Sequence, residues 1–87
     1  MNITISYSEK TNKRDGNYLG LNLSDLVYSL NNNLRRRHHA SCSAEFRSGH
    51  VSIEVTGAGQ DVCQPYIDAF RTAMERRHGY KMFVSFA

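Results

Sequence analysis

Two short runs of basic residues are the part of this sequence best suited to recognising anions. The first run comprises Arg35, Arg36, Arg37, His38 and His39, and the second comprises Arg76, Arg77 and His78. Each guanidinium presents a planar fork of N–H donors that matches phosphate and carboxylate oxygens. Cations also collect at helix C-termini because they complement the helix macrodipole. Helix capping is therefore the alternative explanation for both runs.

Three consecutive arginines exceed what capping requires, and they cannot all point the same way on a helix, so at least one must project into solvent. The sequence therefore predicts a docking edge for a nucleic-acid backbone or for an acidic protein surface. The residues predicted to bind there are Arg35, Arg36, Arg37, His38, Arg76 and Arg77.

A polar, turn-rich stretch over residues 8–20 is predicted to form a long loop, which adds Lys10, Lys13 and Arg14 to the candidate binding residues. Asp15 followed by glycine favours a type I′ turn, so a hairpin is the alternative. We expect this loop to lie beside residues 57–61, where glycines lead into a helix. Such a connection can hold an anion, but it matches no phosphate-binding or dinucleotide-binding pattern. We interpret it as an ordinary strand-to-helix turn.

His38, His39 and Cys42 have a spacing that could hold a metal ion. Closed zinc sites usually draw paired ligands from two places, and the second pair is missing here, which favours a solvated helix end. Cys42 and Cys63 are expected at opposite ends of the domain, farther apart than the roughly 7 Å between Cα atoms that a disulfide allows. The sequence thus predicts two free thiols. No nucleophile–His–Asp set is indicated by spacing, and the sequence predicts neither an enzyme nor a bound cofactor or metal.

Periodic apolar residues indicate the elements that position these side chains. Strands are predicted over residues 2–7, 43–47, 51–56 and 80–86, with a tight turn at residues 48–49 between the middle two. The order strand, helix, strand, strand, helix, strand predicts a ferredoxin-like α+β fold in a single domain, residues 1–87. Two helices would then pack on one face of a four-stranded antiparallel sheet, with the first and third strands at its centre.

The ends of the two helices are predicted from capping signals. The first helix should begin at an N-cap Asn22, with Leu21 as part of a hydrophobic staple, and should end in the run 35–39. The second should be capped by Asp61 or Gln64 and should stop at Gly79. Pro65 would be its first helical residue if Gln64 is the cap. We expect the helices to run in the same direction, which would join the two basic runs into one edge.

RNA-recognition domains share this order of elements and stack bases on aromatic residues of the two central strands. The open face of the predicted sheet instead carries Thr4, Ser6, Ser52 and Glu54 on those strands, and only Phe83 on the last strand offers an aromatic platform. The arginine-bearing glycine loop that follows the first strand in acylphosphatases is also missing. Neither family resemblance is therefore assigned.

The 87 residues carry 11 Lys and Arg against 8 Asp and Glu, a formal net charge of +3. No apolar stretch is typical of a signal peptide or a membrane span, which predicts a cytoplasmic protein. Small size without a catalytic set favours a non-enzymatic inhibitor or modulator of a larger nucleic-acid-handling complex, of the phage or mobile-element anti-defence type, for example an anti-CRISPR. A direct RNA- or DNA-binding module that uses the basic helix-end edge is the alternative. The chain is expected to be a monomer or a homodimer through an exposed edge strand, either residues 43–47 or the last strand.

Overall fold

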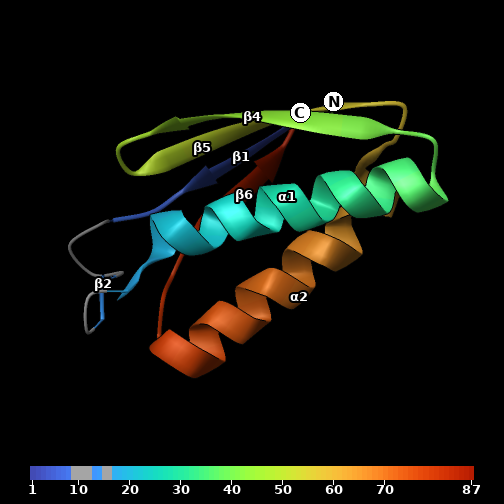
Figure 1. The fold of residues 1–87 in the computed structure, drawn as a ribbon. Coiled ribbons are helices and arrows are strands. Elements are labelled where there is room, and N and C mark those ends of the chain that lie inside the picture. The colour runs from blue at the N-terminus through green and yellow to red at the C-terminus, as the bar shows by residue number, and fades with distance from the viewer. Residues whose placement is uncertain (9–12, 15–16) are drawn as a thin grey trace.

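Two helices cover one face of a four-stranded antiparallel sheet in the computed structural model, which describes residues 1–8, 13–14 and 17–87 (Figure 1). The main elements are β1 (Asn2–Ser6), α1 (Leu19–Arg37), β4 (Ser41–Arg47), β5 (His50–Thr56), α2 (Gln60–His78) and β6 (Phe83–Phe86). The strand order β4-β5-β1-β6 places β1 and β5, the first and third of these strands along the chain, at the centre. The predicted ferredoxin-like fold is confirmed.

Alternation along the strands and helical spacing along α1 and α2 place the apolar residues in one core. Ile3 and Ile5 of β1 are fully buried and pair with Ile53 and Val51 of β5. The helices contribute Leu19, Leu23, Leu26, Leu30 and Leu34 from α1 and Cys63, Ile67 and Met74 from α2. Burying one leucine stabilises the fold by about 1.5–3 kcal/mol. This outweighs the weak helix propensity of the asparagines at residues 31–33, at most ~0.7 kcal/mol each.

The N-terminal part of α1 differs from the prediction. The helix begins at Leu19 rather than after Asn22, because Leu19 is buried in phase with Leu23 and Leu26. Leu21, predicted to take part in a hydrophobic staple, is 62% exposed instead. Core burial therefore decided where the helix starts, and the capping signal did not.

The segment before α1 was predicted to be a long loop, and the hairpin alternative describes it better. A two-residue strand β2 (Lys13–Arg14) pairs antiparallel with β3 (Asn17–Tyr18). Asp15 and Gly16, the predicted turn, lie outside the described residues, as does Lys10.

The start of α2 also lies upstream of both predicted caps. Gly59, in an extended conformation, is the N-cap, and it makes no side-chain capping hydrogen bond. Pro65 consequently lies inside the helix, where it lacks the N–H that would bond to the carbonyl of Asp61. The predicted stop at Gly79 is confirmed, with φ at 68° and its N–H donating to the carbonyl of Glu75 at 2.9 Å. The last strand is shorter than predicted and begins at Phe83.

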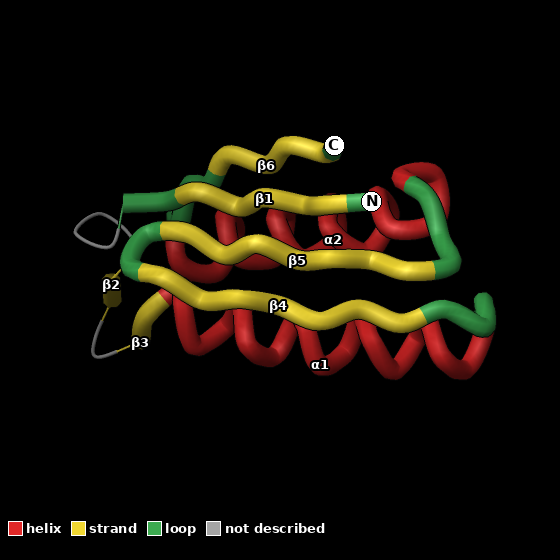
Figure 2. Tube along the Cα trace, turned by 90° about the horizontal axis from the view of Figure 1, so that it is seen from above, coloured by secondary structure: helices red, strands yellow, loops and turns green. Residues whose placement is uncertain are grey.

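The two helices run in opposite directions, so the predicted parallel pair was wrong (Figures 1 and 2). Each helix returns antiparallel to the strand before it, and these strands, β1 and β5, are antiparallel to each other. The helices must therefore be antiparallel too. We call the end with the C-terminus of α1, the start of β4 and the N-terminus of α2 the arginine end. The other end, with the C-terminus of α2, the start of α1, β2, β3 and the β4–β5 turn, is the hairpin end.

No helix within the described residues is both long enough and apolar enough to cross a membrane.

Candidate functional site

The first basic run forms the tip of α1, and we call Arg35, Arg36, Arg37, His38 and His39 the arginine cluster. All five side chains are exposed. Successive residues of an α-helix are rotated by about 100°, so the three arginines fan out around the axis. Leu34, which directly precedes them, is fully buried. The cluster is therefore a charged tip on a helix that the core holds in place.

A left-handed residue ends α1 and fixes the geometry of this tip. His39 has φ at 50°, a conformation that residues other than glycine rarely adopt. The N–H groups of His38 and Ala40 both donate to the carbonyl of Leu34, each at 3.0 Å. Ala40 is buried and lies close to Gly57, where an added Cβ would be 3.2 Å from the Ala40 Cβ. The helix end is thus packed against the connection between β5 and α2.

The arginine cluster forms no ion pair with any carboxylate in residues 1–8, 13–14 and 17–87. Elsewhere, charges are partly neutralised: Arg47 pairs with Glu45 at 2.7 Å, and the N-terminal ammonium lies 3.9 Å from Glu54. A single exposed ion pair contributes only about 0–1 kcal/mol. An anion held at this tip would therefore need several guanidinium groups acting together.

Arg76 and Arg77 lie at the hairpin end, so the predicted basic edge that joins both runs does not form. They are exposed at the C-terminus of α2, at the same end of the molecule as the start of α1 (Figure 1). β2, which carries Lys13 and Arg14, lies at this end as well. The turn at residues 57–61 was expected beside these residues, but it lies at the arginine end. The candidate binding residues thus divide into two groups at opposite ends of the helices.

Cys42 and Cys63 were expected at opposite ends of the domain, but both lie at the arginine end. Both are free thiols, as predicted. Burial raises the pKa of the Cys42 thiol, and the nearby Cys63 raises it further. Burial also raises the pKa of Cys63, with a second raising effect from Asp61 and a lowering one from the N-terminal ammonium. Raised pKa values keep both thiols protonated, and a protonated thiol is a poor nucleophile and a poor metal ligand.

The predicted metal alternative at His38, His39 and Cys42 gains nothing from the geometry. Among the residues that the structure describes, no group of three or more His, Cys, Asp or Glu side chains is arranged to hold a metal ion. The backbone N–H of Cys42 instead donates to the side-chain oxygen of Asn31 at 2.9 Å, and its thiol points toward the carbonyl of Val27. Cys42 is therefore tied to α1.

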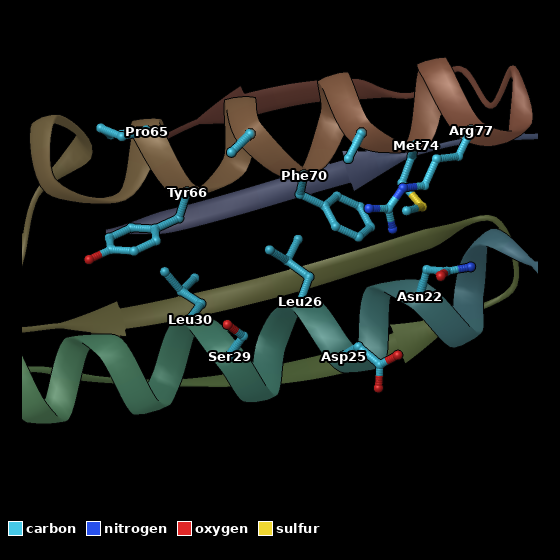
Figure 3. Close-up of a pocket in the computed structure, with 12 residues that line it drawn as sticks. Asn22, Asp25, Leu26, Ser29, Leu30, Pro65, Tyr66, Phe70, Met74 and Arg77 are labelled. Carbon is cyan, nitrogen blue, oxygen red and sulfur yellow. The ribbon is translucent and has the colours of Figure 1, made fainter.

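A groove of about 750 Å³, which was not predicted from the sequence, lies between the two helices (Figure 3). Tyr66 and Phe70 of α2 point across it toward Leu26 and Leu30 of α1. Arg77 extends along the groove at the hairpin end. The spacing of Tyr66 and Phe70, one helical turn apart, could have indicated this groove, because the two residues extend the apolar stripe of α2 beyond those needed for the core.

The open face of the sheet is polar along its central strands, as predicted. Its residues there are Asn2, Thr4 and Ser6 on β1 and His50, Ser52 and Glu54 on β5. One row crosses the whole sheet at the hairpin end, from Arg47 through His50 and Ser6 to Phe83. Phe83 is 79% exposed, so it is an aromatic platform at the edge of an otherwise polar face.

The arginine end presents exposed guanidinium groups, whose geometry suits oxyanions. The groove between the helices presents mainly apolar side chains. No protein-family model, no curated protein and no solved structure matches this chain.

Proposed function

We propose that this chain is a non-enzymatic interaction protein that docks through the arginine cluster onto an acidic surface of a larger nucleic-acid-handling complex. Docking there would block or modulate that complex. The observation that carries the proposal is that Arg35, Arg36 and Arg37 are exposed, adjacent and without a carboxylate partner among the described residues. Such groups retain their full capacity for bidentate hydrogen bonds to a partner's carboxylates.

A protein surface is favoured over a nucleic acid because the sheet lacks the usual means of reading bases. Direct single-strand binders stack successive bases on aromatic residues, and the central strands present Thr4, Ser6, Ser52 and Glu54 instead. A small domain that presents one charged tip is suited to occupying a site on a larger machine. We further propose that the chain acts in the cytoplasm and belongs to the phage or mobile-element anti-defence class, of which anti-CRISPR proteins are one kind.

Direct RNA or DNA binding is the second candidate, and the row from Arg47 to Phe83 on the open sheet face favours it. A base stacked on Phe83 would lie beside Ser6 and His50, with a cation at the far end of the row. Stacking on one exposed aromatic residue contributes about 1–3 kcal/mol. Arg47 is already paired with Glu45, which weakens its contribution and leaves this candidate second.

The test compares charge reversal at the two helix ends. The variants are Arg35→Glu/Arg36→Glu/Arg37→Glu and the matched control Arg76→Glu/Arg77→Glu, each checked for native circular dichroism. Each is used for affinity capture from nuclease-treated lysate of the source organism, with the captured complex identified by mass spectrometry. We expect the wild type and the control to retain a nucleic-acid-handling complex and the triple variant to lose it. If a folded triple variant captured the complex as well as the wild type, the cluster would serve only to complement the helix macrodipole.

The second candidate is measured with labelled single-stranded and duplex oligonucleotides, for which we expect only weak binding. A direct binder would lose affinity steeply between about 50 and 200 mM salt. Tight binding with that salt dependence, reduced by Phe83→Ala and unchanged by the triple arginine variant, would replace the first candidate with the second.

A further inference from the structure

The two edges of the sheet are not equally protected against pairing with another strand. β6 has only four residues, whereas β4 has seven and pairs with β5 without a bulge along its whole length. The sequence of β4, SCSAEFR, contains neither proline nor lysine. Short strands, bulges, prolines and charged side chains, lysine above all, are usual means by which proteins block sheet edges. Of these, β4 has only two residues of opposite charge, Glu45 and Arg47.

The backbone groups that β4 offers outward follow from its turn. A two-residue turn makes its flanking residues, Arg47 and His50, a hydrogen-bonded pair. Alternate residues then bond to β5, so the N–H and C=O groups of Ala44 and Phe46 point away from the sheet. Cys42 has the same outward phase, and the hydrogen bond from its N–H to Asn31 confirms that phase. Asn31 therefore closes the first half of this edge, while no hydrogen bond within residues 1–8, 13–14 and 17–87 closes the second half.

The side chains at the open half are self-complementary. Phe46 projects toward the helix side of the sheet and is 46% exposed, although Val51 and Ile5, the next two residues of its row, are fully buried. Glu45 and Arg47 flank it on the open face, where they pair with each other at 2.7 Å and both remain mostly exposed, so each can also face the opposite charge of a second copy. An acidic and a basic residue on either side of a central apolar residue become opposite partners when the same strand is laid antiparallel to itself.

We propose that a second copy of this chain binds at the edge of β4, with the two β4 strands antiparallel and Phe46 opposite its own copy. In this register Glu45 of each copy lies opposite Arg47 of the other. These are non-hydrogen-bonded positions, where opposite side chains approach most closely. The two phenylalanine rings cover each other on the helix side, and the sheet continues across both copies.

Other registers fail for identifiable reasons. A two-fold axis normal to the sheet keeps each face continuous only when β4 is centred on a residue. Centres at or before Ala44 require the N–H of Cys42, which Asn31 already binds. A centre at Glu45 places two carboxylates opposite each other, and a centre at Arg47 places two guanidinium groups opposite each other. Like charges in opposite positions are destabilising. Among these registers, the one centred on Phe46 meets neither obstacle.

The test is the oligomeric state of the purified chain, measured by sedimentation equilibrium over a wide range of protein concentrations. We expect a concentration-dependent dimer for the wild type. Glu45→Arg or Arg47→Glu alone should raise the dimer dissociation constant roughly tenfold or more, because two attractive pairs become repulsive. The double variant Glu45→Arg/Arg47→Glu should restore the dimer. Circular dichroism and thermal unfolding establish that each variant is folded.

Phe46→Pro is an independent variant, since it removes an outward N–H and the exposed ring but no hydrogen bond to β5. We expect it to be monomeric. A wild type that stays monomeric at every concentration would overturn the proposal, and so would single reversals that dimerise as well as the wild type. This assembly is measured without any other partner, so its failure is distinguishable from failure of the proposed docking at the arginine cluster.

Discussion

The C-terminal ends of the two helices share one framework and differ in three residues that matter. The sequence Arg-Arg-Arg-His-His-Ala at residues 35–40 corresponds to Glu-Arg-Arg-His-Gly-Tyr at residues 75–80. Each helix ends at a left-handed residue, His39 or Gly79. The residue after it donates its N–H to the carbonyl six positions earlier, from Ala40 to Leu34 at 3.0 Å and from Tyr80 to Met74 at 3.4 Å.

Some residues at these two helix ends serve capping, and others have no capping role. Two arginines and a histidine occur at both ends, and the macrodipole accounts for them. Only α1 has a third arginine in place of Glu75, and only α1 has a histidine where glycine would be unstrained. Only α2 follows its left-handed residue with a large buried side chain, Tyr80. The extra charge of α1 is therefore the part of the arginine cluster that capping leaves unexplained.

The largest expected effect on stability comes from removing the Tyr80 side chain at the hairpin end. This side chain is 1% exposed and its ring stacks on His78, with ring centroids 4.7 Å apart. Tyr80→Ala should lower the free energy of unfolding by about 3–5 kcal/mol, measured by urea denaturation. His78→Ala removes only the stacking partner and should cost about 0.5–1.5 kcal/mol. Similar losses in the two variants would show that the ring does not anchor this end.

Exchanging the charge at residues 35 and 75 tests whether the third arginine of α1 contributes to anion binding. Arg35→Glu makes the end of α1 resemble that of α2, and Glu75→Arg does the reverse. With heparin as a polyanion probe, the slope of log affinity against log salt should fall by about one in magnitude for Arg35→Glu, as for the loss of one phosphate contact. Glu75→Arg should steepen it at the hairpin end. Equal behaviour of both variants and the wild type would remove any special role for Arg35.

Substitutions at the two left-handed residues should have smaller effects on stability, opposite in sign at His39 and Gly79. Gly79→Ala should cost about 1 kcal/mol, since a Cβ there has nothing within 4 Å and only the backbone conformation is strained. His39→Gly should stabilise the fold by up to about 1 kcal/mol for the same reason. Thermal unfolding of the two variants measures both. A destabilising His39→Gly would mean that the imidazole makes a contact that offsets its strain.

The smallest effect concerns the two thiols, which both lie at the arginine end. A thiol whose pKa is raised by folding keeps its proton to higher pH in the native state than in the unfolded chain, where its pKa has the ordinary value of 9.0. The free energy of unfolding is therefore unaffected below that value and falls as pH rises above it. Cys63→Ala should flatten this slope in urea midpoints measured from neutral to alkaline pH. An unchanged slope would assign the pH dependence to other groups.

The sequence predicted the architecture because alternation and helical spacing are local signals that the core reinforces. Ile3, Ile5, Val51 and Ile53 alternate so clearly that strand positions and central placement followed. Helix starts were less predictable. Asn22 and Pro65 are genuine capping signals, yet Leu19 and Gly59 define the helices because burial and connection length decide the first turn.

The exposure of the individual basic residues was predicted correctly, but the two basic runs were wrongly placed at the same end of the molecule. Exposure of Arg35 and Arg76 follows from their types, but their separation depends on the direction of α2, which β5 sets through its pairing with β1. The same error placed Cys42 and Cys63 at opposite ends. Residues 43–47 were predicted as a possible exposed edge strand, and β4 does lie at the edge of the sheet. The bond that covers the start of β4 could not be predicted, because the amide of Asn31 reaches Cys42 only in the folded chain.

That single amide has a consequence for how this protein behaves at high concentration. In the proposed dimer both β4 edges are occupied, and the four-residue β6 leaves only a short ladder on which further growth could begin. Replacing Asn31 by alanine would remove the partner of the Cys42 N–H, so that the outward groups of Cys42, Ala44 and Phe46 could all bond to an incoming strand. Unprotected edges of this kind seed aggregation, and we therefore expect Asn31→Ala to lower the solubility of the chain at high concentration.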